Sequence, residues 1–480
     1  MTPILEFEDF HVAGILDGVS VHVNPGETVA LIGASGSGKS VLALSAVGLG
    51  VAARRPTEGA LRISGRDFSN ATEKQWRTVR GKAVSLVFQE PMTALDPLMK
   101  VGKQLRLVVK QKERVCALLK SVGLPEHVEN SFPHQLSGGQ RQRVLIAMAI
   151  AHNPDVIIAD EPTTALDATV QDSILKLLAR VVQEHGSALL MITHDLSLIK
   201  DMCERTYVMD RGRVVEEGPT RDIITKPQHQ TTRELIAAAA PAPDAPHTPT
   251  NADILWKGTD LTQTFGPVHA LRGVNLTLRK GEKLGIVGES GSGKSTLLSL
   301  ITGLAQPTSG AMTRKPGLRC QMVFQDPATA LNPRMRIGDS IAEAMAAPDR
   351  NEVIRLLESV GLTAEDASRF PHEFSGGQRQ RISIARALAG KPHVLVADEA
   401  VSALDVVRRA QIVDLLNEVT ADTGVALVFV SHDLATIRQT CDNVVVLQNG
   451  SIVERGRVTD VWDSPQQPYT QQLLGSVRHI

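Results

Sequence analysis

Apolar residues recur along this chain in short runs that alternate with longer segments of helical period. The runs have the length of β-strands, and the intervening segments repeat their apolar positions every three or four residues. The runs occupy residues 28–32, 156–159, 188–193, 283–287, 394–397 and 426–430. Because strands that alternate with helices form parallel sheets covered by helices, the pattern predicts an α/β fold with mostly parallel sheets.

A polar or glycine residue of chemical interest follows each of these runs. They are Gly33, Asp160 and His194 in the first half of the chain, and Gly288, Asp398 and His432 in the second half. In open α/β sheets, ligands bind outside the carboxyl ends of the strands. We therefore expect these residues to gather at the ligand-binding edge of each sheet.

The chain is an internal repeat. GASGSGKS at 33–40 recurs as GESGSGKS at 288–295, and further pairs such as Glu161 with Glu399 recur downstream. The offset between matching residues drops from 255 to 238 because the stretch 294–325 is shorter than its counterpart. The sequence therefore predicts two copies of one domain, at 1–236 and 254–480, the second with a trimmed β region. Residues 237–253 contain four prolines and are expected to form a semi-extended linker.

Composition narrows the function classes. The 480 residues carry 51 Lys and Arg against 52 Asp and Glu, a balance that argues against a general nucleic-acid binder. No uncharged run reaches the roughly 18 residues of a membrane span, and no secretory signal is visible at the start. Four widely spaced cysteines suit a reducing cytoplasm.

The two glycine-rich segments match the P-loop pattern, which places a loop of backbone N–H groups around phosphate at a helix start. Lys39 and Lys294 are expected to reach the β- and γ-phosphates, and Ser40 and Ser295 to bind Mg²⁺. The expected phosphate-binding residues are Gly33, Ser35, Gly36, Gly38, Lys39, Ser40 and Val41, and Gly288, Ser290, Gly291, Gly293, Lys294, Ser295 and Thr296.

Two adjacent acids end an apolar strand in each copy. Consecutive strand residues face opposite ways, so the two acids need different roles. Asp160 and Asp398 suit an outer-sphere Mg²⁺ contact, whereas Glu161 and Glu399 suit a base for the attacking water.

A second anion-binding pattern, LSGGQRQR at 136–143 and FSGGQRQR at 374–381, begins a helix in each copy. Within one domain this receptor is surplus to the P-loop, so we expect it to grip the γ-phosphate bound to the other copy. Its expected ligand-binding residues are Ser137, Gly139 and Gln140, and Ser375, Gly377 and Gln378.

This series of motifs resembles the ATP-binding cassette (ABC) ATPases over nearly the whole chain. The resemblance implies that Gln89 and Gln325 contact Mg²⁺ and water, that Asp167 and Asp405 belong to the D-loops, and that His194 and His432 contact the γ-phosphate. Phe10 and Phe265 occupy the place where this family stacks an aromatic ring on adenine, and core packing remains an equal alternative for both. ABC domains work as head-to-tail pairs, so the implied assembly is an intramolecular pseudo-dimer that binds ATP and Mg²⁺ in two sites.

Finer motifs are similar to the paired ATPases of the peptide, nickel and opine import family. These are QEPMTALDP and DEPTTALDATVQ in the first copy, QDPATALNP and DEAVSALDV in the second, and SPQQPYTQQLL at 464–474. The resemblance implies a cytoplasmic ATPase, peripheral on the cell membrane, that serves two multi-spanning permease subunits and an extracytoplasmic substrate-binding protein. It implies no contact with nucleic acid or with the cargo. Di- or oligopeptide import is the first expectation, nickel, metallophore or opine import the second, and a soluble translation or repair ATPase the third.

Overall fold

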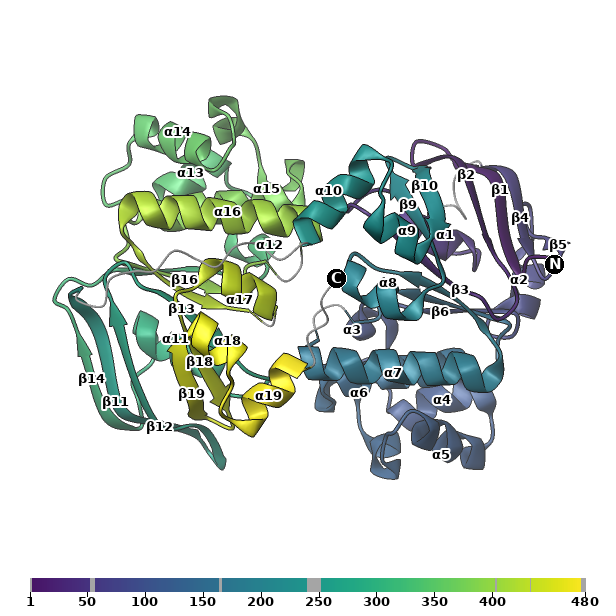
Figure 1. Cartoon of the computed structure of the whole chain (residues 1–480), viewed down its shortest axis with the longest axis horizontal. Coiled ribbons are helices and arrows are strands. Elements are labelled where there is room, and N and C mark those ends of the chain that lie inside the picture. Colours follow the sequence, from purple (N-terminus) through teal and green to yellow (C-terminus); the bar gives the residue numbers. More distant parts are fainter. Residues whose placement is uncertain are drawn as a thin grey trace.

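The computed structural model describes residues 2–51, 57–163, 166–239, 252–401, 404–431 and 433–475. The two copies lie side by side, and each carries its antiparallel sheet at the outer end of the molecule (Figure 1). The mostly parallel α/β class predicted from the sequence is confirmed. Among the residues that the structure describes, no helix combines the length and the apolar character needed to cross a bilayer.

The first copy is built on a six-stranded sheet of order β10-β9-β3-β8-β7-β6, in which only β10 runs antiparallel to its neighbour. A second, antiparallel sheet has the order β2-β1-β4-β5. The strands are β1 (Leu5–Val12), β2 (Leu16–Val23), β3 (Thr28–Gly33), β4 (Thr57–Ile63), β5 (Arg66–Asp67), β6 (Val84–Val87), β7 (Val156–Asp160), β8 (Ala188–Ile192), β9 (Arg205–Asp210) and β10 (Arg213–Pro219).

The helices of the first copy cover both faces of its large sheet. They are α1 (Lys39–Ser45), α2 (Glu73–Val79), α3 (Pro91–Ala94), α4 (Val101–Val109), α5 (Lys112–Ser121), α6 (Gly138–Ile150), α7 (Ala168–His185), α8 (Leu196–Met202), α9 (Thr220–Thr225) and α10 (Gln230–Ala239). Residues of β7 enter two separate cores in alternation, Ile157 on the side of α6 and α7 and Ile158 on the side of α1. This double burial explains why the strands read as unbroken apolar runs.

The second copy repeats this plan with the order β15-β16-β17-β13-β18-β19 and a three-stranded antiparallel sheet, β12-β11-β14. Its strands are β11 (Ile254–Phe265), β12 (Val268–Arg279), β13 (Lys283–Val287), β14 (Ser309–Arg314), β15 (Cys320–Val323), β16 (Val394–Asp398), β17 (Ala426–Val430), β18 (Asn443–Gln448) and β19 (Ser451–Arg457). Its helices are α11 (Lys294–Thr302), α12 (Pro327–Ala330), α13 (Ile337–Ala342), α14 (Arg350–Ser359), α15 (Gly376–Ala389), α16 (Val406–Thr423), α17 (Leu434–Thr440), α18 (Val458–Asp463) and α19 (Pro468–Gly475).

One contact that supports the P-loop helix is made by a different arginine in the trimmed second copy. In the first copy, Arg80, which follows α2, donates from Nε to the carbonyl oxygen of Val47 at 2.6 Å and from Nη2 to that of Gly48 at 2.9 Å. The second copy has no counterpart of α2 among its described elements, and Arg314 of β14 donates instead to Thr302 O at 3.2 Å. An arginine therefore binds the carboxyl end of the P-loop helix in both copies, from a different element in each.

The last helix of each copy reaches toward the other copy. Helix α10 packs against α16, and α19 lies against α7 (Figure 1). Helix α10 continues to Ala239, so the first three residues of the predicted linker belong to this helix. Residues 240–251 of the predicted linker lie outside the described part of the chain.

Candidate functional site

The P-loop of the first copy joins β3 to α1. Gly38 precedes the helix with φ of 104°, a left-handed conformation, and a Cβ there would lie 2.5 Å from Leu16 Cδ2, so only glycine fits. Lys39 begins the helix and is buried, and its Nζ donates to Gly33 O at 2.8 Å and Ala34 O at 2.9 Å. Burial lowers the pKa of Lys39, and the nearby carboxylates of Glu161, Asp160 and Asp405 oppose this shift.

The acid pair sits where β7 ends. Asp160 is 7% exposed, and burial raises its pKa to about 6, although a hydrogen bond with Ser40 acts in the opposite direction. One of its carboxylate oxygens, Oδ1, is buried without a hydrogen-bond partner. An unsatisfied buried carboxylate oxygen beside a hydroxyl group is the oxygen-rich setting that Mg²⁺ prefers, so these residues fit the predicted metal.

Glu161 leaves the strand with an unusual backbone. Its φ is 45°, and Glu399, its counterpart, has φ of 49°, so the second acid of each pair is in the left-handed region that costs a non-glycine residue energy. The two acids are therefore set apart in two ways. Consecutive strand residues face opposite sides, and the backbone also turns at the second acid. Backbone strain of this kind occurs at functional sites, and here it falls on the residue predicted to act as the base.

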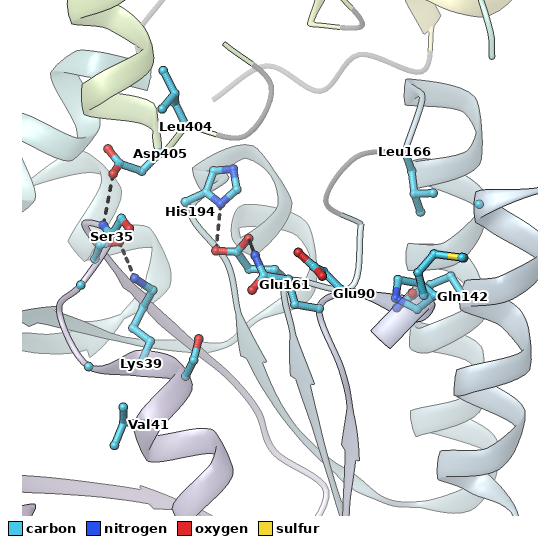
Figure 2. A pocket seen from close by; sticks show the side chains of 18 of the residues that line it. Ser35, Lys39, Val41, Glu90, Gln142, Glu161, Leu166, His194, Leu404 and Asp405 are labelled. Atoms are coloured by element: carbon cyan, nitrogen blue, oxygen red, sulfur yellow. Dashed lines mark hydrogen bonds and ion pairs between the residues drawn. The ribbon is translucent and has the colours of Figure 1, made fainter. Parts of the chain in front are cut away.

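The carboxylate of Glu161 is held by two other predicted site residues. Gln89 donates from Nε2 to Glu161 Oε2 at 2.7 Å. His194 Nδ1 lies 3.2 Å from Glu161 Oε1 (Figure 2). Three side chains that the sequence spreads over more than 100 positions therefore meet at one edge of the sheet.

The second copy reproduces the P-loop lysine and the acids. Lys294 Nζ donates to Gly288 O at 2.7 Å and Glu289 O at 2.8 Å, and burial lowers its pKa. Burial and the neighbouring Glu399 raise the pKa of Asp398. The predicted γ-phosphate contact His432 lies outside the described residues.

The signature segments begin α6 and α15 with the same cap. Ser137 Oγ accepts from Gln140 N at 3.3 Å while Gln140 Oε1 accepts from Ser137 N at 3.0 Å, and Ser375 and Gln378 repeat this capping box. Since the serine oxygen accepts in this cap, its hydroxyl proton is left to donate to an anion. The predicted ligand residue Gly139 also has a packing role, because a Cβ there would lie 2.4 Å from Val170 Cγ1.

A cavity of about 810 Å³ opens around the first P-loop and draws residues from both copies. Lys39, Ser40, Gln89, Glu161 and His194 all line it, and so do three residues of the second copy, Gln325, Leu404 and Asp405. Figure 2 shows Leu404 and Asp405 of the second copy across the cavity from Lys39, Glu161 and His194. Its described lining does not include Ser375 or Gly377 and does include Gly138 of the first copy's own signature. Gln325, predicted as a metal contact of the second copy, therefore lines the cavity around the first P-loop.

The repeat offset of 255 predicts that Phe10 pairs with Phe265, and the strand registers show that this pairing is wrong. Phe10 pairs with Val19 across β1 and β2, and Leu261 pairs with Val274 across β11 and β12. Because Val19 and Val274 are matched by the offset of 255, Leu261 is the structural counterpart of Phe10. The hairpin of the second copy is longer, and this length shifts Phe265 to its tip.

Burial separates the roles of the two phenylalanines. Phe10 is 2% exposed and its ring packs edge-on against Phe7 at 5.2 Å between centroids, which places it in the hydrophobic core. Phe265 is 57% exposed and has the open face that stacking requires. In the first copy the hairpin residue that lines the cavity is Ile15, which the sequence analysis missed because nothing in its neighbourhood marks it.

Gln142 is a second lining residue that the sequence analysis missed. Its Nε2 is buried without a partner, whereas Nε2 of its counterpart Gln380 donates to Phe324 O, next to Gln325, at 3.4 Å. The signal was present, because both copies read GGQRQR and this is the second glutamine.

Comparison with known proteins agrees with this geometry. The family model described as ABC transporter matches residues 16–164 and 271–402, and the one described as Oligopeptide/dipeptide transporter, C-terminal region, matches 453–480. The archaeal ribosome recycling factor aABCE1, in complex with the stalk protein aP1, aligns with a TM-score of 0.68 over 92% of this chain and 88% of that chain. At 21% identity it supports the fold alone.

Curated relatives match nearly the full length of the chain, and three of them illustrate the range. Peptidoglycan transport ATP-binding protein YejF of Agrobacterium fabrum is 40% identical over 100% of this chain and 97% of its own. Oligopeptide transport ATP-binding protein OppD of Mycobacterium tuberculosis is 37% identical over 99% and 98%, and Glutathione import ATP-binding protein GsiA of Escherichia coli O157:H7 is 39% identical over 99% and 89%. The chain therefore belongs to the ABC transporter family, among the ATP-hydrolysing ATP-binding proteins of its peptide import branch.

Proposed function

We propose that this chain powers import of di- or oligopeptides by hydrolysing ATP in two sites formed between its copies. The observation that carries the proposal is the cavity in which the first P-loop, Glu161 and His194 meet Asp405 of the second copy. The names of the relatives support peptide-like cargo, since they concern oligopeptides, glutathione and peptidoglycan.

Each composite site takes its P-loop, acids and histidine from one copy and its signature from the other. The first site would combine Lys39, Ser40, Asp160, Glu161 and His194 with Ser375 and Gly377. The second would combine Lys294, Ser295, Asp398, Glu399 and His432 with Ser137 and Gly139. Since Ser375 and Gly377 do not line the present cavity, this assignment requires the copies to move closer together when ATP binds.

The residues of the first site divide the work of hydrolysis. Lys39 binds the phosphates with its buried charge, and its two carbonyl partners are exchanged for phosphate oxygens. Glu161, held by Gln89 and His194, accepts the proton of the attacking water at a carboxylate oxygen. Ser40 and Asp160 would hold Mg²⁺, which neutralises charge that develops on the phosphate oxygens.

Substitution of the two glutamates tests the catalytic assignment. Glu161→Gln and Glu399→Gln, made separately, are expected to lower steady-state ATP turnover steeply, because each removes one base. Glu204→Gln, at an exposed glutamate, serves as the matched control and should leave turnover unchanged. If either site variant turns over ATP at the parent rate, the proposal of two hydrolytic sites is wrong.

Partners and cargo need separate experiments. The chain purified from membranes is expected to carry two multi-spanning subunits, and cells that lack it should lose uptake of labelled di- or oligopeptides that a substrate-binding protein delivers. Loss of nickel or opine uptake alone would point to the alternative cargo. Salt-sensitive sedimentation with ribosomes or DNA, without membrane subunits, would contradict a role in transport.

A further inference from the structure

The tail segments that precede the last helix of each copy are anchored in the same way. Glu216 in the first copy and Glu454 in the second each accept two backbone N–H groups, at 2.8 and 2.9 Å and at 2.8 and 3.1 Å. The donors are Gln228 and His229, and Gln466 and Gln467. The anchoring hydrogen bonds are therefore alike in the two tails, although the second donor is His229 in one copy and Gln467 in the other.

The two tails differ three positions after the first anchored donor. In the second copy this residue is Tyr469, which is 8% exposed, and its hydroxyl oxygen accepts from the backbone N–H of Glu289 in the P-loop at 2.9 Å. In the first copy the corresponding Thr231 donates from its hydroxyl to Asp210 at 3.3 Å. In the second copy the hydroxyl of the tail therefore binds the P-loop, whereas the hydroxyl at the matching position of the first copy binds Asp210.

This hydroxyl acts on the peptide group that also holds the P-loop lysine. The peptide between Gly288 and Glu289 accepts Lys294 Nζ at its carbonyl, at 2.7 Å, and donates its N–H to Tyr469. A peptide group is planar and rigid, so a bond at each end fixes its orientation. Lys294 is buried and needs that carbonyl at a fixed place, because burial disfavours its charged form.

The same P-loop residue also contacts the other copy. The carboxylate of Glu289 accepts a hydrogen bond from Thr169 Oγ1, near the start of α7, at 2.8 Å. Helix α19, which carries Tyr469, lies against α7 as well. Ala34 replaces this glutamate in the first copy, so these contacts belong to the second P-loop.

We propose that Tyr469 is a positioning residue for ATP at the second site. Its hydroxyl preorganises the P-loop, so this site binds ATP more tightly than it would without the hydroxyl. The inference rests on the proposed assignment of the two nucleotide sites. Preorganisation raises affinity because the loop is already ordered before the ligand arrives.

Equilibrium binding of a fluorescent ATP analogue to the full-length chain tests the inference without requiring hydrolysis or transport. In a Lys39→Ala background only the second site should bind, and Tyr469→Phe is expected to weaken binding about fivefold, as loss of one hydrogen bond implies. In a Lys294→Ala background, where only the first site binds, the same substitution should have no effect. Thr231→Val is the matched control and should change neither affinity.

A tail that merely loosens would give a different result. Leu473→Ala removes buried apolar contact from α19 and leaves the tyrosine hydroxyl in place. If Leu473→Ala weakens binding at the second site as much as Tyr469→Phe does, general loosening explains both and the inference is wrong. It is equally wrong if Tyr469→Phe has no effect in the Lys39→Ala background or acts alike in both. If each lysine variant still binds two nucleotides, the site assignment itself fails and the inference fails with it.

Discussion

Asp405, in the second copy, accepts a hydrogen bond from the backbone N–H of Ser35 in the P-loop of the first copy, at 3.2 Å. The same carboxylate caps α16 by accepting from Arg408 N at 3.0 Å. One side chain therefore fixes the start of a helix in one copy and touches the phosphate loop of the other. This contact joins the P-loop of the first copy directly to the start of a helix in the second copy.

The substitution Asp405→Asn should separate the effect of helix capping from the effect of the carboxylate charge. Asn caps helices about as well as Asp, so Asp405→Asn should keep the stability of the chain while it weakens the bond to Ser35 and lowers turnover at the first site several-fold. Turnover is measured in a Glu399→Gln background, which leaves only the first site active. Asp349→Asn, at the cap of α14 and away from the P-loops, is the control for a change in capping alone. Unchanged turnover in Asp405→Asn would show that the contact has no role in the reaction.

The buried Asp160 predicts a pH-dependent stability with a definite sign. Burial raises the pKa of Asp160 to about 6, above its ordinary value of 3.8, so the folded chain binds this proton more tightly than the unfolded chain does. Its contribution to stability therefore falls as the pH rises from about 4 to about 6, and the full cost, at most about 3 kcal/mol, is present above that range.

Asp160→Asn removes this cost together with the carboxylate oxygen that we propose to hold Mg²⁺. The variant should be more stable than the parent at pH 7.5, the difference should disappear near pH 4, and ATP turnover should be lost. Urea unfolding at the two pH values measures the effect, and Asp155→Asn, at an exposed carboxylate beside the start of β7, should not reproduce it. A variant that is less stable than the parent at pH 7.5 would contradict the predicted burial cost.

The stability of each copy should depend on the arginine that binds the carboxyl end of its P-loop helix, although the two arginines come from different elements. Arg80→Ala and Arg314→Ala should each destabilise their own copy by about 1 to 3 kcal/mol, because carbonyl groups lose a charged donor. Arg80→Ala should cost more, since that side chain binds two carbonyls and pairs with Glu73. Denaturant unfolding of the variants measures the loss, with Arg66→Ala as an exposed control. Equal stability of Arg314→Ala and the parent would show that the trimmed copy does not need this contact.

Much of the site was predictable because its chemistry lies at strand ends. The runs that precede Asp160 and Asp398 are buried on both faces, so they stand out as apolar sequence, and the repeat doubles each signal. The meeting of Gln89, Glu161 and His194 follows from the shared direction of parallel strands.

Other features have no local signal. The left-handed backbone of Glu161 is imposed by its surroundings, since glutamate does not favour it. The counterpart of Phe10 cannot be found from the repeat offset of 255, because that offset is set by the P-loop motifs. The hairpin that precedes the P-loop is longer in the second copy, and the motifs do not show this change. The bond between Asp405 and Ser35 joins residues 370 positions apart, and only the packing of the two copies brings them together.

The pair Thr169 and Glu289 offers the most direct test of communication between the copies at the second P-loop. The hydroxyl of Thr169 donates to the carboxylate of Glu289 at 2.8 Å, and both side chains are only partly exposed. Thr169→Val and Glu289→Ala should each weaken ATP binding in a Lys39→Ala background, and the second substitution makes the loop resemble the first copy, which has Ala34.

The double variant decides whether the two residues act through each other. Because each single variant already breaks the bond, the combined change should cost less than the sum of the two, with a coupling of about 0.5 to 3 kcal/mol. Strict additivity would mean that the bond does not contribute to ATP binding, even if both residues matter separately. Glu289→Gln keeps an acceptor for Thr169 but removes the charge beside Lys294. If the hydrogen bond causes the coupling, this variant should retain most of the coupling energy. If the charge of Glu289 causes it, the coupling energy should be lost.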